Sequence, residues 1–171
     1  MKTVILMRHA KARVESDDGR DFTRALAGKG RDRAEQTAQV LATAGIQVQR
    51  ILTSAAVRTV QTTEIVEPLL CPSGVVLKLA ELYLAPGPEW LAAVHQHCDA
   101  DEDTVLLVGH NPGIAWLMAN MAGFAFEVPT ATAAVFRCDC TEWKDVTLHN
   151  GDAIAMTHRV VRGELMPLPQ S

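Results

Sequence analysis

No apolar run in this 171-residue sequence approaches the ~18 residues that a membrane-spanning helix requires. The first apolar run, residues 3–7, is also shorter than the roughly 7 to 15 residues of a signal peptide's hydrophobic region. Arg8 and His9 follow that run at once. These absences predict a soluble, cytoplasmic protein that has no membrane partner.

Basic residues are not in excess, because 16 lysines and arginines stand against 20 aspartates and glutamates, a formal net charge of −4. Proteins that bind nucleic acid generally carry a basic surplus or stripe, so this balance argues against a nucleic-acid partner. The sequence also lacks internal repeats, low-complexity tracts and any linker long enough to divide it. With 48% apolar and 21% charged residues, we predict one folded domain over residues 1–171.

Cysteine is scarce too, since four residues are too few for a disulfide scaffold in a chain of this length. Two of them, Cys138 and Cys140, would share one face of a strand, which a metal site could use. Such a site needs two more ligands, and the nearby candidates, His149 and His158, stand at no familiar spacing. We therefore predict two ordinary thiols, no metal and no other cofactor.

Patterns typical of strands and of helices alternate along most of the chain. The predicted strands cover residues 3–7, 50–54, 75–84 and 104–109, and the predicted helices cover 31–45, 55–70, 86–98 and 112–123. Ser54 is the predicted N-cap of the second helix. The last third reads as shorter extended pieces, at 131–139, 146–151 and 153–160, with a turn at Asn150 and Gly151. The alternation predicts an α/β protein: a three-layer α/β/α sandwich with a mostly parallel central sheet.

Three of the predicted strands lead into residues that packing does not explain. The first runs into Arg8 and His9, the second precedes Arg58 by one helical turn, and the most apolar one runs into His110. Because ligands of parallel sheets bind at the carboxyl ends of the strands, these groups are expected to meet on one rim. Such a cluster suits an anion with several oxygens. Phosphate is the natural one, since arginine presents a planar fork to two oxygens.

Four segments carry a resemblance to a known family: LMRHAKA (6–12), ILTSAAVRTVQTTEIV (51–66), LAELY (79–83) and VLLVGHNPGI (105–114). In order and spacing, over roughly residues 3 to 120, they resemble the successive motifs of the histidine phosphatase superfamily, beginning with its RHG-like motif. The small size is similar to that of its SixA-like phosphohistidine phosphatase branch. The resemblance implies a phosphoglycerate mutase-like fold with no large lid insertion. The loop at 21–30 resembles a family segment in which Arg-Pro-Leu-Thr is usual, but here it reads Arg-Ala-Leu-Ala.

The resemblance also implies the roles of four residues. His9 would be the nucleophile, transiently phosphorylated, and Arg8, Arg58 and His110 would bind the phosphoryl group. The chemistry is reasonable, because a neutral imidazole is an available nucleophile at neutral pH. Guanidinium groups and an N–H donor would stabilise the charge on the phosphoryl oxygens without a metal.

Three further residues have candidate roles. Glu81 lies where the wider superfamily often places a general acid, and an exposed glutamate at the end of a strand is the equal alternative. Asn111 is a candidate hydrogen-bond donor near the phosphate. Lys11 could guide an acidic phosphoprotein or simply face solvent.

The leading hypothesis is a metal-independent phosphatase that acts on phosphohistidine in a signalling or phosphotransfer protein. It is favoured because no insertion after the third strand would enclose a small substrate. The nearest alternative is a phosphatase of small phosphate esters or nucleotides. A non-catalytic phosphate-binding module is the alternative of another class, although binding alone would need only cations and not two histidines. The expected partner is thus a phosphorylated protein of the histidine-containing phosphotransfer type, or a small phosphate ester.

Overall fold

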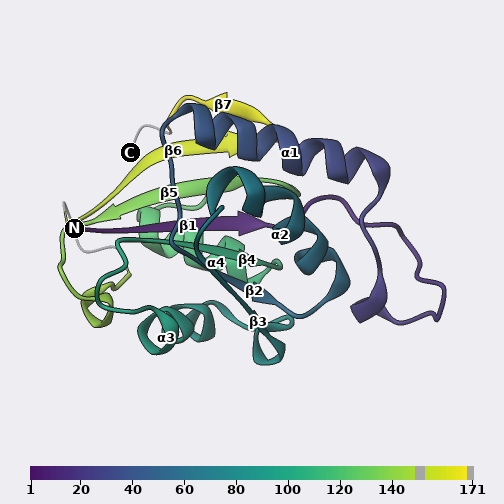
Figure 1. Ribbon diagram of the computed structural model, residues 1–171, viewed down its shortest axis with the longest axis horizontal. Helices are drawn as coiled ribbons and strands as arrows, with labels where there is room; N and C mark the ends of the chain where they lie inside the picture. The colour runs from purple at the N-terminus through teal and green to yellow at the C-terminus, as the bar shows by residue number, and fades with distance from the viewer. Residues whose placement is uncertain (149–152, 169–171) are drawn as a thin grey trace.

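A seven-stranded sheet forms the centre of the molecule in the computed structural model, which describes residues 1–148 and 153–168 (Figure 1). The order of the strands across the sheet is β3-β2-β4-β1-β5-β6-β7. The strands are β1 (Lys2–Arg8), β2 (Arg50–Ser54), β3 (Val75–Leu79), β4 (Thr104–Gly109), β5 (Ala133–Cys138), β6 (Ile154–Val161) and β7 (Glu164–Met166). The strand nearest the N-terminus is therefore at the middle of the sheet, next to β4.

The first four strands run parallel, as predicted, whereas the C-terminal strands do not. β3, β2, β4 and β1 pair in parallel, but β5 lies antiparallel to β1, and β6 and β7 continue the antiparallel pairing. The connection between the last two strands explains their direction. β6 and β7 are joined only by Arg162 and Gly163, whose φ angles of 54° and 82° suit a tight hairpin, while a parallel pair needs a long crossover. The half of the sheet that carries the predicted site is the parallel half.

Helices cover both faces of the sheet, which confirms the predicted α/β/α sandwich (Figure 1). The helices α1 (Gly28–Thr43) and α2 (Val57–Leu70) pack together on one face, and α3 (Gly87–His97) and α4 (Gly113–Ala122) pack together on the other. Alternate residues of β1 enter the two cores: Leu6 packs on the α3 and α4 side, and Ile5 on the α1 and α2 side. This burial on both faces explains the continuous apolar run of β1.

Two predicted boundaries differ from the structure around the second and third strands. The helix α2 begins at Val57, so Ser54 ends β2 and does not cap the helix. The extended stretch predicted at 75–84 is a strand only as far as Leu79, and a short 3-10 helix, η2 (Ala80–Leu82), follows it. Residues 80–86 alone connect β3 to α3, so the chain has no large lid insertion there, as predicted.

The C-terminal third was predicted least well. β5 and β6 occur where extended pieces were expected, but β7 was not predicted. The piece expected at 146–151 forms no strand over residues 146–148, and its turn at Asn150 and Gly151 lies outside the described residues. Within residues 1–148 and 153–168, none of the helices has the length and apolar character needed to cross a membrane.

Candidate active site

A cavity opens at the carboxyl ends of β1 and β4. The ends of these neighbours align, with Arg8 opposite Gly109, and the backbone N–H of His9 donates to the Gly109 carbonyl at 2.9 Å. The residues that follow the two strands, His9 and His110, are thereby brought together, with ring centroids 5.3 Å apart. The cavity has a volume of about 390 Å³ and is lined by Arg8, His9, Lys11, Ala12, Asp21, Arg24, Arg58, Leu84, His110, Asn111 and Thr130.

His9 is buried and held in one tautomer. Its Nδ1 lies 2.8 Å from the backbone carbonyl of Ala10, and since a carbonyl only accepts, Nδ1 carries the proton. The Nε2 lone pair accepts a hydrogen bond from Nε of Arg58 at 3.3 Å. Burial, followed by the nearby charges of Arg58 and Arg8, lowers the pKa of His9 from 6.5 to about 4. At neutral pH the imidazole is therefore uncharged, with an unprotonated Nε2 facing a guanidinium.

Arg58 is also buried, at 2% exposure, in the first turn of α2. Its guanidinium donates to the backbone carbonyl of Asp21 at 2.7 Å and, through Nη2, to the Asp21 Oδ2 at 2.9 Å. The hydroxyl of Tyr83 donates to the same Oδ2 at 2.5 Å, and Nε of Arg24 donates to Oδ1 at 2.9 Å. These hydrogen bonds, led by the one from Tyr83, hold the pKa of Asp21 well below its usual range. Asp21 is thus an ionised carboxylate that fixes two arginines.

His110 is oriented by a residue from another strand. Its Nε2 lies 2.8 Å from Oγ of the fully buried Ser54 at the end of β2. Burial, followed by the effects of His9 and Arg58, lowers the pKa of His110 from 6.5 to about 3. Ser54 was predicted to cap α2, and the structure gives it this different place because β2 delivers it to the same rim.

Arg8 and Asn111 share one acceptor. The backbone carbonyl of Val128 accepts from Nη1 of Arg8 at 2.9 Å and from Nδ2 of Asn111 at 3.0 Å. Three buried polar atoms of the cavity residues have no hydrogen-bond partner within the described chain: Nε of Arg8, Oδ1 of Asn111 and Nδ1 of His110. Because buried polar groups are normally paired, these atoms suit a polar ligand in the cavity.

The structure brings most of the predicted site residues together and leaves one outside. Arg8, His9, Arg58, His110, Asn111 and Lys11 all line the cavity, and Lys11 is exposed. Glu81 is different, because it lies on the exposed side of η2 and does not belong to the lining. Among the described residues, no hydrogen bond or ion pair joins Glu81 to the groups that line the cavity.

Sequence reasoning missed Asp21 and Tyr83. Asp21 is one of several acids in a long polar loop, so nothing in the local pattern distinguishes it. Arg24 lies in the loop that resembles a family segment, and that resemblance was the only signal pointing to it. Tyr83 is the single tyrosine of the chain, and its role depends on a contact with a residue 62 positions away.

The cysteines and their neighbouring histidines were the candidate ligands of a metal site. Within the part of the chain that the structure describes, no group of three or more His, Cys, Asp or Glu residues could hold a metal. Burial raises the pKa of Cys138 to about 12, and also raises that of Cys140. His158 bonds to Thr157 on β6, at 3.0 Å, and His149 lies outside the described residues.

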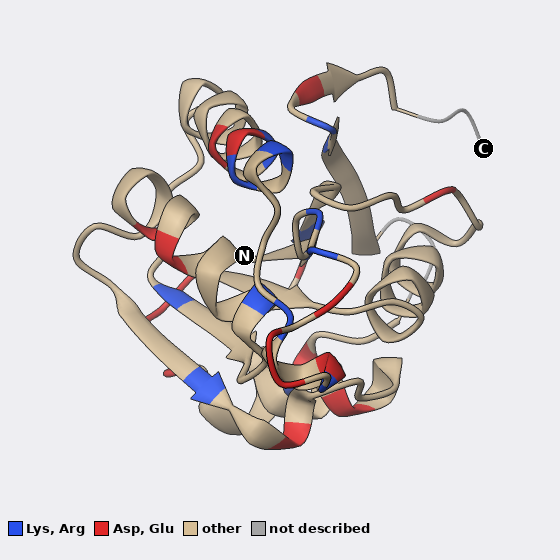
Figure 2. Cartoon of the chain, turned by 90° about the vertical axis from the view of Figure 1, so that its right-hand side faces the viewer, with Lys and Arg blue, Asp and Glu red and all other residues tan. Residues whose placement is uncertain are grey.

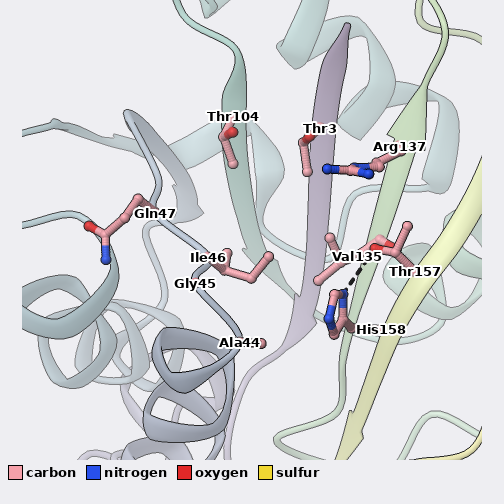
Figure 3. Close-up of a pocket in the computed structure, with 10 residues that line it drawn as sticks. All are labelled: Thr3, Ala44, Gly45, Ile46, Gln47, Thr104, Val135, Arg137, Thr157 and His158. Atoms are coloured by element: carbon pink, nitrogen blue, oxygen red, sulfur yellow. Dashed lines mark hydrogen bonds between the residues drawn. The ribbon is translucent and has the colours of Figure 1, made fainter.

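A different cavity, of about 360 Å³, lies at the opposite end of the sheet, where β1 and β4 begin (Figure 3). Thr3, Thr104 and His158 line it, and Arg137 is its only charged lining residue. It contains one cation and no second histidine, so it lacks the clustered groups of the first cavity.

Figure 2 views the molecule from the end that carries the first cavity.

Comparisons with known proteins agree with this geometry. The family model of the histidine phosphatase superfamily (branch 1) matches residues 4–84. A chain from Agrobacterium tumefaciens, provisionally assigned as a phosphohistidine phosphatase SixA, is 29% identical over 80% of this chain and 92% of its own, with a TM-score of 0.73. A similarly assigned chain from Nakamurella multipartitia is 32% identical over 79% of this chain and 83% of its own, with a TM-score of 0.65.

The fold alone is also shared with a protein histidine phosphatase SixA solved in complex with tungstate. That chain is 21% identical, covers 94% of this chain and 97% of its own, and has a TM-score of 0.75. The residues that the family model matches, 4–84, include Arg8, His9 and Arg58. The chain belongs to the histidine phosphatase superfamily, in its SixA-like branch.

Proposed function

We propose that this chain is a metal-independent phosphatase that removes the phosphoryl group from phosphohistidine on a signalling or phosphotransfer protein. The observation that carries the proposal is the state of His9, which is buried, uncharged and bonded through Nδ1–H, with its Nε2 lone pair 3.3 Å from a guanidinium nitrogen. The whole chain of 171 residues would act as one domain. Its cytoplasmic location stays a prediction.

In the first step the Nε2 lone pair of His9 would attack phosphorus, in line with the bond to the leaving group. A phosphorus–nitrogen bond to His9 forms, and the electron pair of the broken bond goes to the departing group. Water then attacks the phosphorus atom, the bond from phosphorus to Nε2 of His9 breaks with its electron pair returning to the imidazole, and inorganic phosphate is released. The Ala10 carbonyl, 2.8 Å from Nδ1, would stabilise the positive charge that the ring acquires while it carries the phosphoryl group.

Both steps spread negative charge over the equatorial oxygens of the phosphoryl group. Arg8 and Arg58 would bind these oxygens with fixed guanidinium donors, and His110 would contribute an N–H. The hydrogen bond from Arg58 Nε to His9 Nε2 must exchange for one to a phosphoryl oxygen when His9 reacts. Loss of one such donor typically lowers the rate on the order of 100- to 1,000-fold.

The leaving group distinguishes the candidate substrates. Asp21 is the only carboxylate that lines the cavity in the described residues, and its ionised state leaves it no proton to donate. His110, with a pKa of about 3, is not a cationic acid at neutral pH. An alkoxide leaving group needs a proton from an acid in order to depart. Phosphohistidine instead releases an imidazole, whose conjugate acid has an ordinary pKa near 6.5, so it leaves without that help. These groups therefore favour phosphohistidine over an alkyl phosphate.

The proposal is tested by measuring inorganic phosphate released, in the presence of EDTA, from a phosphohistidine peptide, p-nitrophenyl phosphate and glycerol phosphate. We expect turnover of the peptide and the aryl ester, little turnover of the alkyl ester, and none by His9→Ala. His97→Ala, a histidine of α3 outside the cavity, is the matched control and keeps the wild-type rates.

Three results would overturn parts of the proposal. Equal turnover of glycerol phosphate would favour the small-ester phosphatase. Binding of phosphate without turnover of any substrate would favour the non-catalytic module. Activity lost in EDTA and restored by a divalent cation would contradict metal independence.

A further inference from the structure

A third cavity, of about 410 Å³, lies beside the candidate active site and is lined by Lys11, Lys29, Arg33, Thr130 and Arg162. Lys11 and Thr130 line both cavities, so the two share a wall. Four of the five lining residues are cations, and they come from the loop after β1, the start of α1 and the β6–β7 turn. We call these four residues the basic rim.

Backbone contacts hold two members of the basic rim side by side. The backbone N–H of Ala27 donates to the Lys11 carbonyl at 2.9 Å. The first turn of α1 packs so closely on this loop that a Cβ added at Gly30 would lie 2.1 Å from the same carbonyl oxygen. Lys29 is next to Gly30 in the chain, so the positions of Lys11 and Lys29 are set by the fold and do not depend on their side chains.

The other two members are held together by a direct hydrogen bond. Nη1 of Arg33 donates to the backbone carbonyl of Arg162 at 2.6 Å and to Oε1 of Gln36 at 2.9 Å. A Cβ added at Gly163 would lie 2.5 Å from Cβ of Gln36, so the β6–β7 turn packs directly on α1. A hairpin far along the chain is thereby placed against the helix that begins beside the active site.

Within residues 1–148 and 153–168, no acidic side chain pairs with the basic rim. The ion pairs of the described residues involve none of its four cations, and no carboxylate lines its cavity. The candidate active site differs in this respect, because Asp21 pairs with Arg24 and Arg58 there. In a protein with a net charge of −4, four cations around one cavity, without an ion pair to any described residue, make a local field that attracts anions.

We propose that the basic rim docks the acidic residues that flank the phosphohistidine of a protein substrate. The inference rests on the proposed function, since it places the phosphoryl group on His9 and the flanking carboxylates one cavity away. A protein segment is favoured over a nucleotide because the described lining contains no aromatic ring on which a base could stack. Lys11, Lys29 and Arg162 are exposed, which suits a surface that a folded partner approaches.

The test uses two phosphohistidine peptides of equal length, one with glutamates on both sides of the phosphohistidine and one with glutamines there. We expect wild-type kcat/KM for the acidic peptide to exceed that for the neutral one roughly tenfold at low ionic strength, as complementary charge raises association rates. The preference should disappear as salt screens the field.

The matched pair of variants is Lys29→Glu with Arg162→Glu, and Lys78→Glu with Arg137→Glu, which makes the same change of net charge away from the basic rim. The first should lose the preference for the acidic peptide and hydrolyse p-nitrophenyl phosphate within about twofold of wild type. The second variant should keep both the preference for the acidic peptide and the wild-type rate on p-nitrophenyl phosphate. The rate on p-nitrophenyl phosphate also reports that each variant is folded.

Each other outcome is decisive. Equal hydrolysis of the two peptides by the wild type would overturn the docking role and leave the proposed function intact, whereas hydrolysis of neither would overturn the proposed function itself. A preference that survives in Lys29→Glu with Arg162→Glu would place docking elsewhere. Slower hydrolysis of a small bisphosphate by that variant, with the acidic peptide unaffected, would make this cavity a second phosphate subsite and overturn the proposal.

Discussion

The low pKa of His9 gives the most quantitative prediction. A shift from 6.5 to about 4 corresponds to about 3 kcal/mol against the imidazolium form, and burial is its largest cause. At pH 5.5 about 97% of His9 would be neutral, whereas only about 9% would be neutral at the ordinary pKa. Arg58→Gln should raise the pKa of His9 by removing the nearest positive charge, while burial keeps it below 6.5.

The assay is an NMR titration of the histidine ring protons in the free protein, with the signal of His9 assigned by its loss in His9→Ala. Because the folded pKa is lowered, the unfolded chain binds the proton more readily between pH 6.5 and 4. The contribution of neutral His9 to the free energy of unfolding should therefore be fully present above pH 6.5 and fall as the pH drops through that window. A His9 signal that titrates at or above pH 6.5 would refute the argument that burial and two guanidiniums keep this imidazole neutral.

Three further predictions concern the surroundings of the site. Asp21→Ala should lower kcat for p-nitrophenyl phosphate roughly 10- to 100-fold with a smaller change in KM, because Arg24 and Arg58 lose the carboxylate that orients them. Asp21→Asn should lower kcat less, and an unchanged kcat in Asp21→Ala would contradict this role. Gly30→Ala should destabilise the protein by about 2 kcal/mol in thermal unfolding, because the added Cβ would lie 2.1 Å from the backbone oxygen of Lys11. Gly28→Ala is the control and should not destabilise it, since a Cβ there has no neighbour within 4 Å. Ser54→Ala should cost about 2 kcal/mol of stability and reduce activity, since it leaves a buried imidazole nitrogen unpaired; wild-type stability would show that the bond contributes nothing.

The parallel half of the fold and the core of the site could be predicted from the sequence because both follow from local patterns. β1 and β4 are continuous apolar runs, and the residues after them, His9 and His110, meet because parallel neighbours end on the same edge. Arg58 follows from the same argument, since α2 begins directly after β2. The polar residues at the ends of buried strands, His9 and His110, were thus the residues that best predicted where the site lies.

What could not be predicted depends on contacts between distant segments. The antiparallel pairing of β5 with β1 is not encoded in the β5 pattern, which reads as an extended apolar stretch in either direction. Ser54 has the residue type of an N-cap, and only its distance of 2.8 Å to His110 reveals its place. Asp21 lies in a polar loop, and its role becomes visible only when Arg58 and Tyr83 reach it from other elements.

The central claim is that Nε2 of His9 becomes covalently phosphorylated during turnover. The enzyme is mixed with excess phosphohistidine peptide and rapidly quenched into alkali. Mass spectrometry and phosphorus NMR of the quenched protein would then detect the intermediate directly. We predict an acid-labile, alkali-stable phosphoryl group on Nε2 of His9, formed and discharged at rates that account for kcat and absent in His9→Ala. Turnover at the same rate with no phosphoryl group on His9, or with the group on His110, would contradict the account.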